Sequence, residues 1–208
     1  MVNPMAKELD FYFDYSSPYG FLASEQIEAL AARHDRTVNW RPILLGAVFK
    51  VTGQAPLVMA PVKGDYATMD FARSAREHKI DFKMPDTFPI GSVAASRASW
   101  WLLNHEDPTI QAKSADFIHA CYRAYFSGGR DITNVEVLSN IATSMGIDAK
   151  AMVTACGEQS VKDLLRNQVN AAIERGVFGS PIIIVDDEMF WGHDRLEQVE
   201  RWMSTGGW

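Results

Sequence analysis

The sequence predicts an α/β protein in which one sheet is built from two halves, with a helical segment inserted between them. Residues 8–45 read as strand, helix and strand, which is typical of a parallel β-α-β unit. The last fifty residues read as helix, two short strands and helix, while the middle has only helical periodicity. We therefore expect a discontinuous domain of residues 7–64 and 160–208, and a helical insertion domain of residues 65–159.

The first half begins with an aromatic strand that runs into a turn at residues 11–16. Pro18 fits the first turn of the following helix, where its missing N–H costs nothing. One face of that helix carries Tyr19, Ala23, Ile27 and Leu30. Apolar and polar side chains alternate at the start of residues 38–45, which predicts the second strand, and glycines and prolines predict a loop over residues 46–64.

Two amphipathic patterns predict helices in the insertion. The first covers residues 110–125. The second follows a cap at Thr133 or Asn134 and is terminated at Gly146. A loop that contains two prolines, residues 84–91, interrupts the region.

The second half begins with a helical stripe over residues 161–173. The apolar run of residues 181–187 suits a strand that is buried on both faces. Residues 188–191 can pair with it as a hairpin across Asp186 and Asp187. A final short helix is expected over residues 194–203.

The composition limits the function. The chain has 208 residues and a net charge of −6, which argues against nucleic acid and anionic membranes as partners. No stretch is apolar and long enough to span a bilayer, and the first ten residues contain no apolar signal core, so we expect a cytoplasmic protein. The two cysteines, Cys121 and Cys156, are expected to be free thiols.

Ser17 is the first candidate functional residue. Ser17-Pro18-Tyr19-Gly20 stands where a thioredoxin-type redox centre would have Cys-Pro-x-Cys. A helix N-terminus favours an anion, and a serine hydroxyl cannot exchange disulfides but can donate a hydrogen bond to the thiolate of another molecule. Ser-Pro is also a common capping pattern. The residues alone leave both interpretations open.

A family resemblance covers nearly the whole chain. Its motifs are residues 11–19, 171–181 and 188–196. In this order and spacing they resemble the thioredoxin-fold family of the DsbA-like oxidoreductases, and within it the kappa-class glutathione transferases and the 2-hydroxychromene-2-carboxylate isomerases. The resemblance implies a thioredoxin-like sheet with a helical domain inserted between its two halves. It also implies a homodimer.

The resemblance further implies a glutathione site. Pro181 is expected to be cis, so that the backbone of Ser180 can pair with the extended backbone of glutathione. Asp194 would hold the γ-glutamyl ammonium, although it could also simply cap the last helix. His193, next to it, stands where we expect Asn or Ser and is assigned to the same site.

Five further residues complete the predicted site. Gln54 resembles a loop position that is often Asn, and Lys63 resembles a basic residue that reaches the glycyl carboxylate of glutathione. A solvated surface lysine is the alternative for Lys63. Tyr66, Phe88 and Trp191 could line a pocket for an aromatic substrate, or could serve in packing.

The resemblance implies a glutathione-dependent isomerase of aromatic, naphthalene-type catabolism. It would interconvert 2-hydroxychromene-2-carboxylate and trans-o-hydroxybenzylidenepyruvate, with Ser17 stabilising the glutathione thiolate. Two alternatives remain open: a kappa-like glutathione transferase or peroxidase with broad electrophile specificity, and a thioredoxin-like binding module without catalysis. The histidines and cysteines lack metal-ligand spacing, so no metal is predicted.

Overall fold

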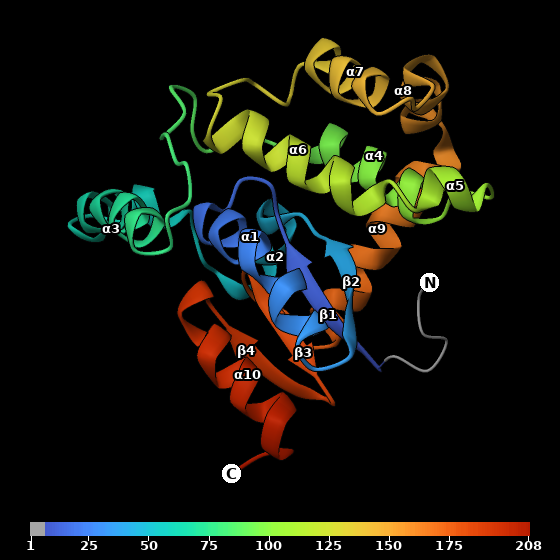
Figure 1. Ribbon diagram of the computed structural model, residues 1–208. Helices are drawn as coiled ribbons and strands as arrows, with labels where there is room; N and C mark the ends of the chain where they lie inside the picture. Colours follow the sequence, from blue (N-terminus) through green and yellow to red (C-terminus); the bar gives the residue numbers. More distant parts are fainter. Residues whose placement is uncertain (1–6) are drawn as a thin grey trace.

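A four-stranded sheet forms the centre of the lower half of the molecule in Figure 1. The computed structural model describes residues 7–208. In the strand order β2-β1-β3-β4, β1 pairs in parallel with β2 and antiparallel with β3, and β4 pairs antiparallel with β3. The strands are β1 (Lys7–Phe13), β2 (Arg36–Pro42), β3 (Ile182–Val185) and β4 (Glu188–Trp191).

The two halves of the sheet meet between β1 and β3, where Phe11 pairs with Ile183. The helical elements of the two halves are α1 (Pro18–Ala32), α2 (Leu45–Thr52), η1 (Leu57–Met59), α9 (Gln159–Glu174), η2 (His193–Arg195) and α10 (Leu196–Thr205). The predicted hairpin is confirmed. Asp186 and Asp187 have φ angles of 49° and 68°, and positive φ at both central residues is typical of a two-residue hairpin turn.

The inserted helices lie over one end of the sheet, at the top and left of Figure 1. They are α3 (Lys63–Glu77), α4 (Val93–Leu103), α5 (Pro108–Gln111), α6 (Ser114–Phe126), α7 (Val135–Ser144) and α8 (Ala149–Gly157). This arrangement confirms the predicted fold class, a thioredoxin-like sheet with a helical domain between its two halves. One core joins both parts, since the ring of Tyr122 on α6 lies 5.6 Å from that of Phe13 on β1. The exact division at residues 65 and 159 stays a prediction.

The second strand begins and ends earlier than predicted, and part of the expected loop is helical. Pairing between β1 and β2 ends at Phe13 and Pro42, so the strand does not reach residue 45. The Leu45 N–H instead donates to the Asp14 carboxylate at 2.6 Å, and Leu45 begins α2. The expected loop of residues 46–64 therefore contains most of a helix.

Local sequence signals explain the helices of the insertion. The predicted helix of residues 110–125 is in fact two helices, because Asp107 caps the four-residue α5 and the chain starts again at Ser114. The helix α7 is confirmed as predicted. Asn134 caps it by accepting the Glu136 N–H, and Gly146, with a φ of 66°, follows its end.

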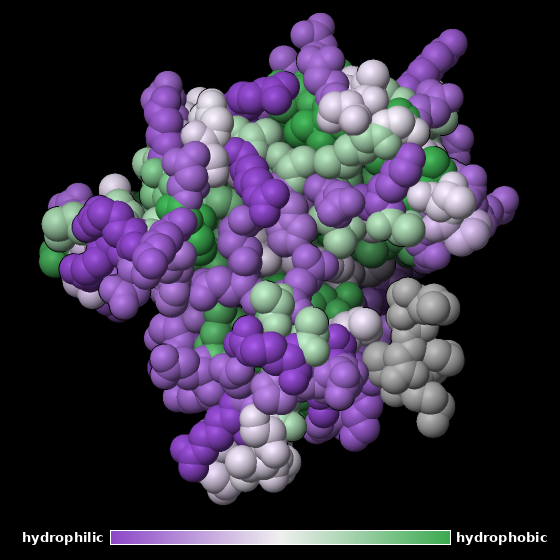
Figure 2. Space-filling view, in the orientation of Figure 1, coloured by the Kyte–Doolittle hydropathy of each residue, from purple (hydrophilic) through white to green (hydrophobic). Residues whose placement is uncertain are grey.

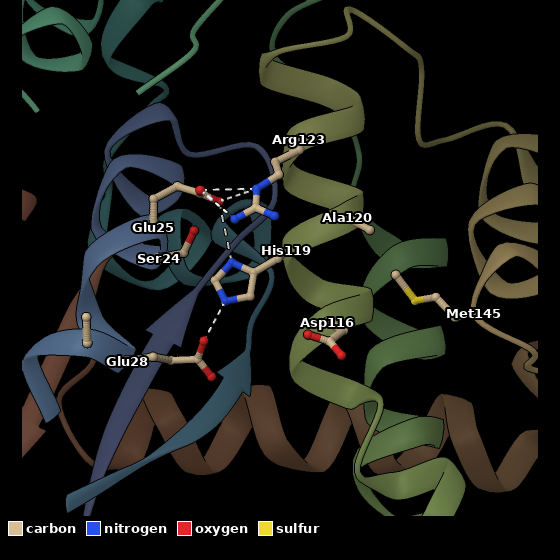
Figure 3. Close-up of a pocket in the computed structure, with 9 residues that line it drawn as sticks. Ser24, Glu25, Glu28, Asp116, His119, Ala120, Arg123 and Met145 are labelled. Atoms are coloured by element: carbon tan, nitrogen blue, oxygen red, sulfur yellow. Dashed lines mark hydrogen bonds and ion pairs between the residues drawn. The ribbon is translucent and has the colours of Figure 1, made fainter. Parts of the chain in front are cut away.

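A cluster of charged side chains joins α1 to α6 (Figure 3). His119 Nε2 lies 2.9 Å from a Glu28 carboxylate oxygen, and Nδ1 lies 3.4 Å from Glu25, which also binds Arg123 at 2.8 Å. Burial disfavours the charged imidazole, but its hydrogen bonds to the two glutamates prevail and raise the pKa of His119 to about 9. The cluster borders a cavity of about 640 Å³ that includes none of the predicted site residues.

The surface is mostly hydrophilic on the face shown in Figure 2, with smaller apolar patches near the helical end. Both cysteines are free thiols, as predicted. Burial raises the pKa of Cys121 well above its usual range and that of Cys156 to about 11. Between residues 7 and 208, no helix combines the length and the apolar character that crossing a membrane would require.

Candidate functional site

The turn between β1 and α1 places Ser17 at the start of the helix. Its Oγ accepts the Gly20 N–H at 3.0 Å, and Pro18 occupies the first turn, so the capping interpretation is confirmed. The same hydroxyl donates to the carbonyl oxygen of Ser180 at 2.9 Å. Ser17 thus caps α1 and also connects the first half of the chain to the second.

The Ser180–Pro181 peptide bond is cis, as the resemblance implies. The Ser180 hydroxyl accepts the Asp14 N–H at 3.0 Å, and the Pro181 carbonyl accepts the Gly192 N–H at 3.1 Å. Within residues 7–208 the Ser180 N–H has no hydrogen-bond acceptor. A short edge of backbone therefore remains beside Ser17 for an extended peptide.

Asp14 is a buried carboxylate beneath this turn, with only 3% of its surface exposed. Its two oxygens accept the Ser16 N–H at 2.8 Å and the Leu45 N–H at 2.6 Å, and its carbonyl accepts the Tyr122 hydroxyl at 3.0 Å. Burial raises its pKa, and the hydrogen bond from Ser16 opposes that shift. Asp14 holds the serine turn and the start of α2 together. An acidic residue directly after a buried aromatic strand was the signal that could have identified it.

Gly20 faces the crowded side of the first turn of α1. A Cβ atom at this position would lie 2.7 Å from the Tyr122 hydroxyl and 2.9 Å from the Ser180 hydroxyl. The packing leaves no room there for the second thiol of a Cys-Pro-x-Cys centre. Both chemical identity and space therefore exclude disulfide exchange by Ser17 and Gly20.

Tyr19 is a meeting point of three helical elements that the sequence alone did not identify. Its ring stacks on His193 of η2, with centroids 4.6 Å apart and planes 5° apart, and its hydroxyl donates to Asp70 of α3 at 2.6 Å. Asp70 also accepts from Arg73 and, at 3.4 Å, from Tyr66. Burial lowers the pKa of His193 and so favours the neutral imidazole.

Asp194 is exposed at the start of the last helical segment. Its carboxylate pairs with Arg195 at 3.0 Å, and 58% of the Asp194 side chain is exposed. Neither η2 nor α10 has a side-chain cap, so the alternative in which Asp194 only caps the last helix is not supported. The segment begins at Gly192, whose φ of 111° provides the turn. The carboxylate therefore remains accessible to a ligand.

The aromatic residues of the predicted substrate pocket lie in different surroundings. Trp191 is 56% exposed and packs so closely on the backbone that a Cβ at Gly179 would lie 2.6 Å from its indole nitrogen. Tyr66 is equally exposed, on α3. Phe88 packs against Phe126 in the core, with ring centroids 6.3 Å apart. Their assignment to one substrate pocket stays a prediction.

The remaining predicted ligands lie just after α2 and at the start of α3. Gln54 is exposed just beyond α2, and Lys63 is the exposed first residue of α3. The loop of residues 84–91, which contains Phe88, contacts the serine turn, because the Ile90 N–H donates to the Ser16 hydroxyl at 3.0 Å. The structure brings Ser17, Ser180 and Pro181 together, and His193 is connected to them through Tyr19. Gln54 and Lys63 stay predicted members of the site.

Comparisons with known proteins identify the family. Residues 8–204 match the family model of the DSBA-like thioredoxin domain. The 2-hydroxychromene-2-carboxylate isomerase of Sphingobium xenophagum is 30% identical over 201 residues, covering 96% of this chain and 99% of the relative. The human glutathione S-transferase kappa 1 is 26% identical over 220 residues, with coverages of 98% and 96%.

A solved structure agrees with the sequence comparisons. The fold is similar to that of a 2-hydroxychromene-2-carboxylate isomerase with a TM-score of 0.84 and 27% identity, covering 95% of this chain and 94% of that one. Sequence and fold thus point to the same relatives over nearly the full length. The chain belongs to the DSBA-like thioredoxin family, within the group of the 2-hydroxychromene-2-carboxylate isomerases.

Proposed function

We propose that this protein is a glutathione-dependent isomerase that interconverts 2-hydroxychromene-2-carboxylate and trans-o-hydroxybenzylidenepyruvate. The observation that carries the proposal is the contact of Ser17 with Ser180 beside a cis proline, in a chain whose relatives are named as this isomerase. A serine at the place of a reactive thiol suits an enzyme that uses the thiol of a bound peptide.

The residues present fit glutathione. The unpaired N–H of Ser180 suits an extended peptide backbone. The exposed carboxylate of Asp194 suits the γ-glutamyl ammonium, and the exposed ammonium of Lys63 suits the glycyl carboxylate. Gln54 and His193 would contribute polar contacts. These opposite charges match the two charged ends of the tripeptide.

Bound glutathione supplies a thiol that can add reversibly to a conjugated double bond, which then rotates as a single bond. Ser17 would stabilise the thiolate form. Its Oγ is held by the Gly20 N–H, so rotation about the Cβ–Oγ bond can turn its hydrogen from the Ser180 carbonyl toward a sulfur. About 1.4 kcal/mol from this hydrogen bond gives tenfold more thiolate at neutral pH.

The Ser17→Cys variant tests where the thiol binds. When this variant is incubated with glutathione disulfide, the introduced thiolate should attack one sulfur and release one glutathione, leaving a mixed disulfide. Because Cys121 and Cys156 are free in the wild type, Cys121→Ser and Cys156→Ser are included in both the variant and its control. Mass spectrometry should find the adduct only in the protein that carries Ser17→Cys. Absence of the adduct would place the glutathione sulfur elsewhere.

A kappa-like glutathione transferase or peroxidase is the second candidate, because the human kappa enzyme is also a full-length relative. Its glutathione site would be the same, so the electrophile decides. Turnover of the chromene carboxylate that stops without glutathione supports the isomerase. Turnover of chlorodinitrobenzene without effect on the chromene favours the transferase. Failure to bind glutathione in calorimetry favours the binding module without catalysis.

We further propose a cytoplasmic homodimer, as the resemblance implies. Several apolar side chains of the segment from α2 to α3 are exposed and could be covered by a second copy; they are Val51, Met59, Val62 and Met69, with exposures of 66%, 67%, 88% and 61%. Light scattering on the purified protein measures the mass. A monomer at micromolar concentration would contradict the dimer.

A further inference from the structure

A second cavity lies between α2, α4 and α9 and includes none of the residues assigned to glutathione or to the aromatic substrate. Its volume is about 340 Å³. Its apolar lining consists of Leu44, Ala47, Val93, Leu165 and Val169. Its polar lining consists of Arg97, Lys162, Arg166 and Asn170. The cavity thus combines an apolar wall with three cationic side chains, and no carboxylate of residues 7–208 lines it.

Arg97 is the most informative of the three cations. Its guanidinium is partly buried, and Nη1 reaches only the carbonyl of Cys156, at 3.5 Å. Its Nε is buried and has no hydrogen-bond partner among the described residues. In the part of the chain that the structure describes, no carboxylate lies within 4.0 Å of it. A partly buried cation without a counter-charge is unfavourable, and an anion in the cavity would relieve that cost.

Lys162 and Arg166 add to the positive field from α9. They are four positions apart, so both side chains lie on the same face of the helix. Arg166 pairs with Asp163 at 2.9 Å but is 62% exposed, while Lys162 is half-buried and has no carboxylate within 4.0 Å among residues 7–208. The three cations of the cavity therefore have only one acidic neighbour among the described residues, and the cavity carries a net positive charge.

We propose that this cavity binds a small organic carboxylate with an apolar body. The cations would hold the carboxylate, and the aliphatic side chains would cover the body. Inorganic phosphate presents the same anionic chemistry but leaves the apolar wall bare, so the organic anion is the better match. The proposal does not rest on the proposed isomerase activity, because the two sites share no residue.

Nuclear magnetic resonance of methyl-labelled protein tests the proposal with benzoate as the probe. Benzoate should shift the methyl signals of Val93, Leu165 and Val169. Benzyl alcohol, which has the same ring without the charge, should shift them at least tenfold less at equal concentration, and added sodium chloride should weaken benzoate binding. Phosphate should bind more weakly than benzoate. Equal binding of the alcohol would contradict the ionic part of the proposal, and tighter binding of phosphate would contradict the organic body.

Charge-removing variants locate the contact. Lys162→Gln and Arg166→Gln lie near the surface and should fold normally, and each should weaken benzoate binding by roughly threefold to tenfold. Lys150→Gln, which removes an exposed lysine from α8, is the matched control and should leave the affinity unchanged. Arg97→Gln, provided that it folds, should abolish benzoate binding, because it removes the partly buried cation. If benzoate binds Lys162→Gln and Arg166→Gln as it binds the wild type, or shifts only signals near Trp191, the site does not exist.

Discussion

The Ser17 hydroxyl donates a hydrogen bond of 2.9 Å to the carbonyl of Ser180, which lies 163 positions later in the chain. The acceptor belongs to the residue that precedes the cis proline, and the donor belongs to the cap of α1. One hydroxyl therefore serves local helix formation and the union of the two halves of the domain. Its proposed chemical role uses the same hydrogen atom.

Ser17→Ala should lower the isomerase rate by roughly a hundredfold, the low end for loss of a main donor to an anion, because the helix N-terminus remains. It should also cost about 1 kcal/mol of stability through the lost cap. Asn134→Ala removes the cap of α7 and is the matched control. In urea unfolding, we expect the control to lose a similar amount of stability. Its activity should be unchanged. Wild-type turnover of Ser17→Ala would leave Ser17 as a cap alone.

Gly20→Ala should destabilise the protein by about 1–3 kcal/mol, because its Cβ would overlap the hydroxyls of Tyr122 and Ser180. Gly46→Ala is the control. A Cβ there meets nothing within 4 Å, so alanine should stabilise α2 slightly. Adding Tyr122→Phe removes the hydroxyl that lies nearest to the new Cβ. The double variant should therefore lose less stability than the sum of the losses in the two single variants. Equal melting temperatures for Gly20→Ala and Gly46→Ala would refute this packing argument.

Asp194→Asn should weaken glutathione binding about tenfold, through loss of the ionic contact with the γ-glutamyl ammonium. Stability should hardly change, since the exposed pair with Arg195 contributes little and no cap is lost. Calorimetric titration measures the affinity. Glu197→Gln neutralises an acid in the first turn of α10 and is the control. Equal glutathione affinity in both variants would remove Asp194 from the site.

The pH dependence of stability should reveal His119. Its pKa is raised to about 9 in the folded protein, above the ordinary value of 6.5, so folding favours the protonated form. This contribution is fully present below about pH 6.5 and is lost as the pH rises through about 9; it amounts to at most about 3 kcal/mol. Urea unfolding between these pH values measures it. His119→Gln should make the decrease in stability between these pH values smaller. His78→Gln, at an exposed position, should leave that decrease unchanged.

The parts of the fold that could be predicted are those with local causes. Asn134 and Gly146 mark both ends of α7, and Asp186 and Asp187 mark the hairpin. The helix α2 could not be predicted in the same way. It has only eight residues, and its start depends on the distant carboxylate of Asp14.

In the candidate site, too, the features with local causes could be predicted, and those that depend on tertiary packing could not. The capping role of Ser17 follows from its immediate neighbours, and the cis bond at Pro181 followed from the resemblance. The stacking of Tyr19 on His193 could not be predicted, because it requires α1 and η2 to be packed together first. The contact of Tyr19 with Asp70 depends in the same way on where α3 docks.

The pairing of β1 with β3 has a consequence for synthesis on the ribosome. β1 is translated before its neighbour β3, and the helical insertion is made in between. The buried side chains of β1, which are Leu9, Phe11 and Phe13, therefore belong to a strand whose second edge stays unpaired until β3 has been made. A nascent chain that stops before Ile182 would carry an exposed apolar strand and no assembled site, which makes it a natural client for a chaperone.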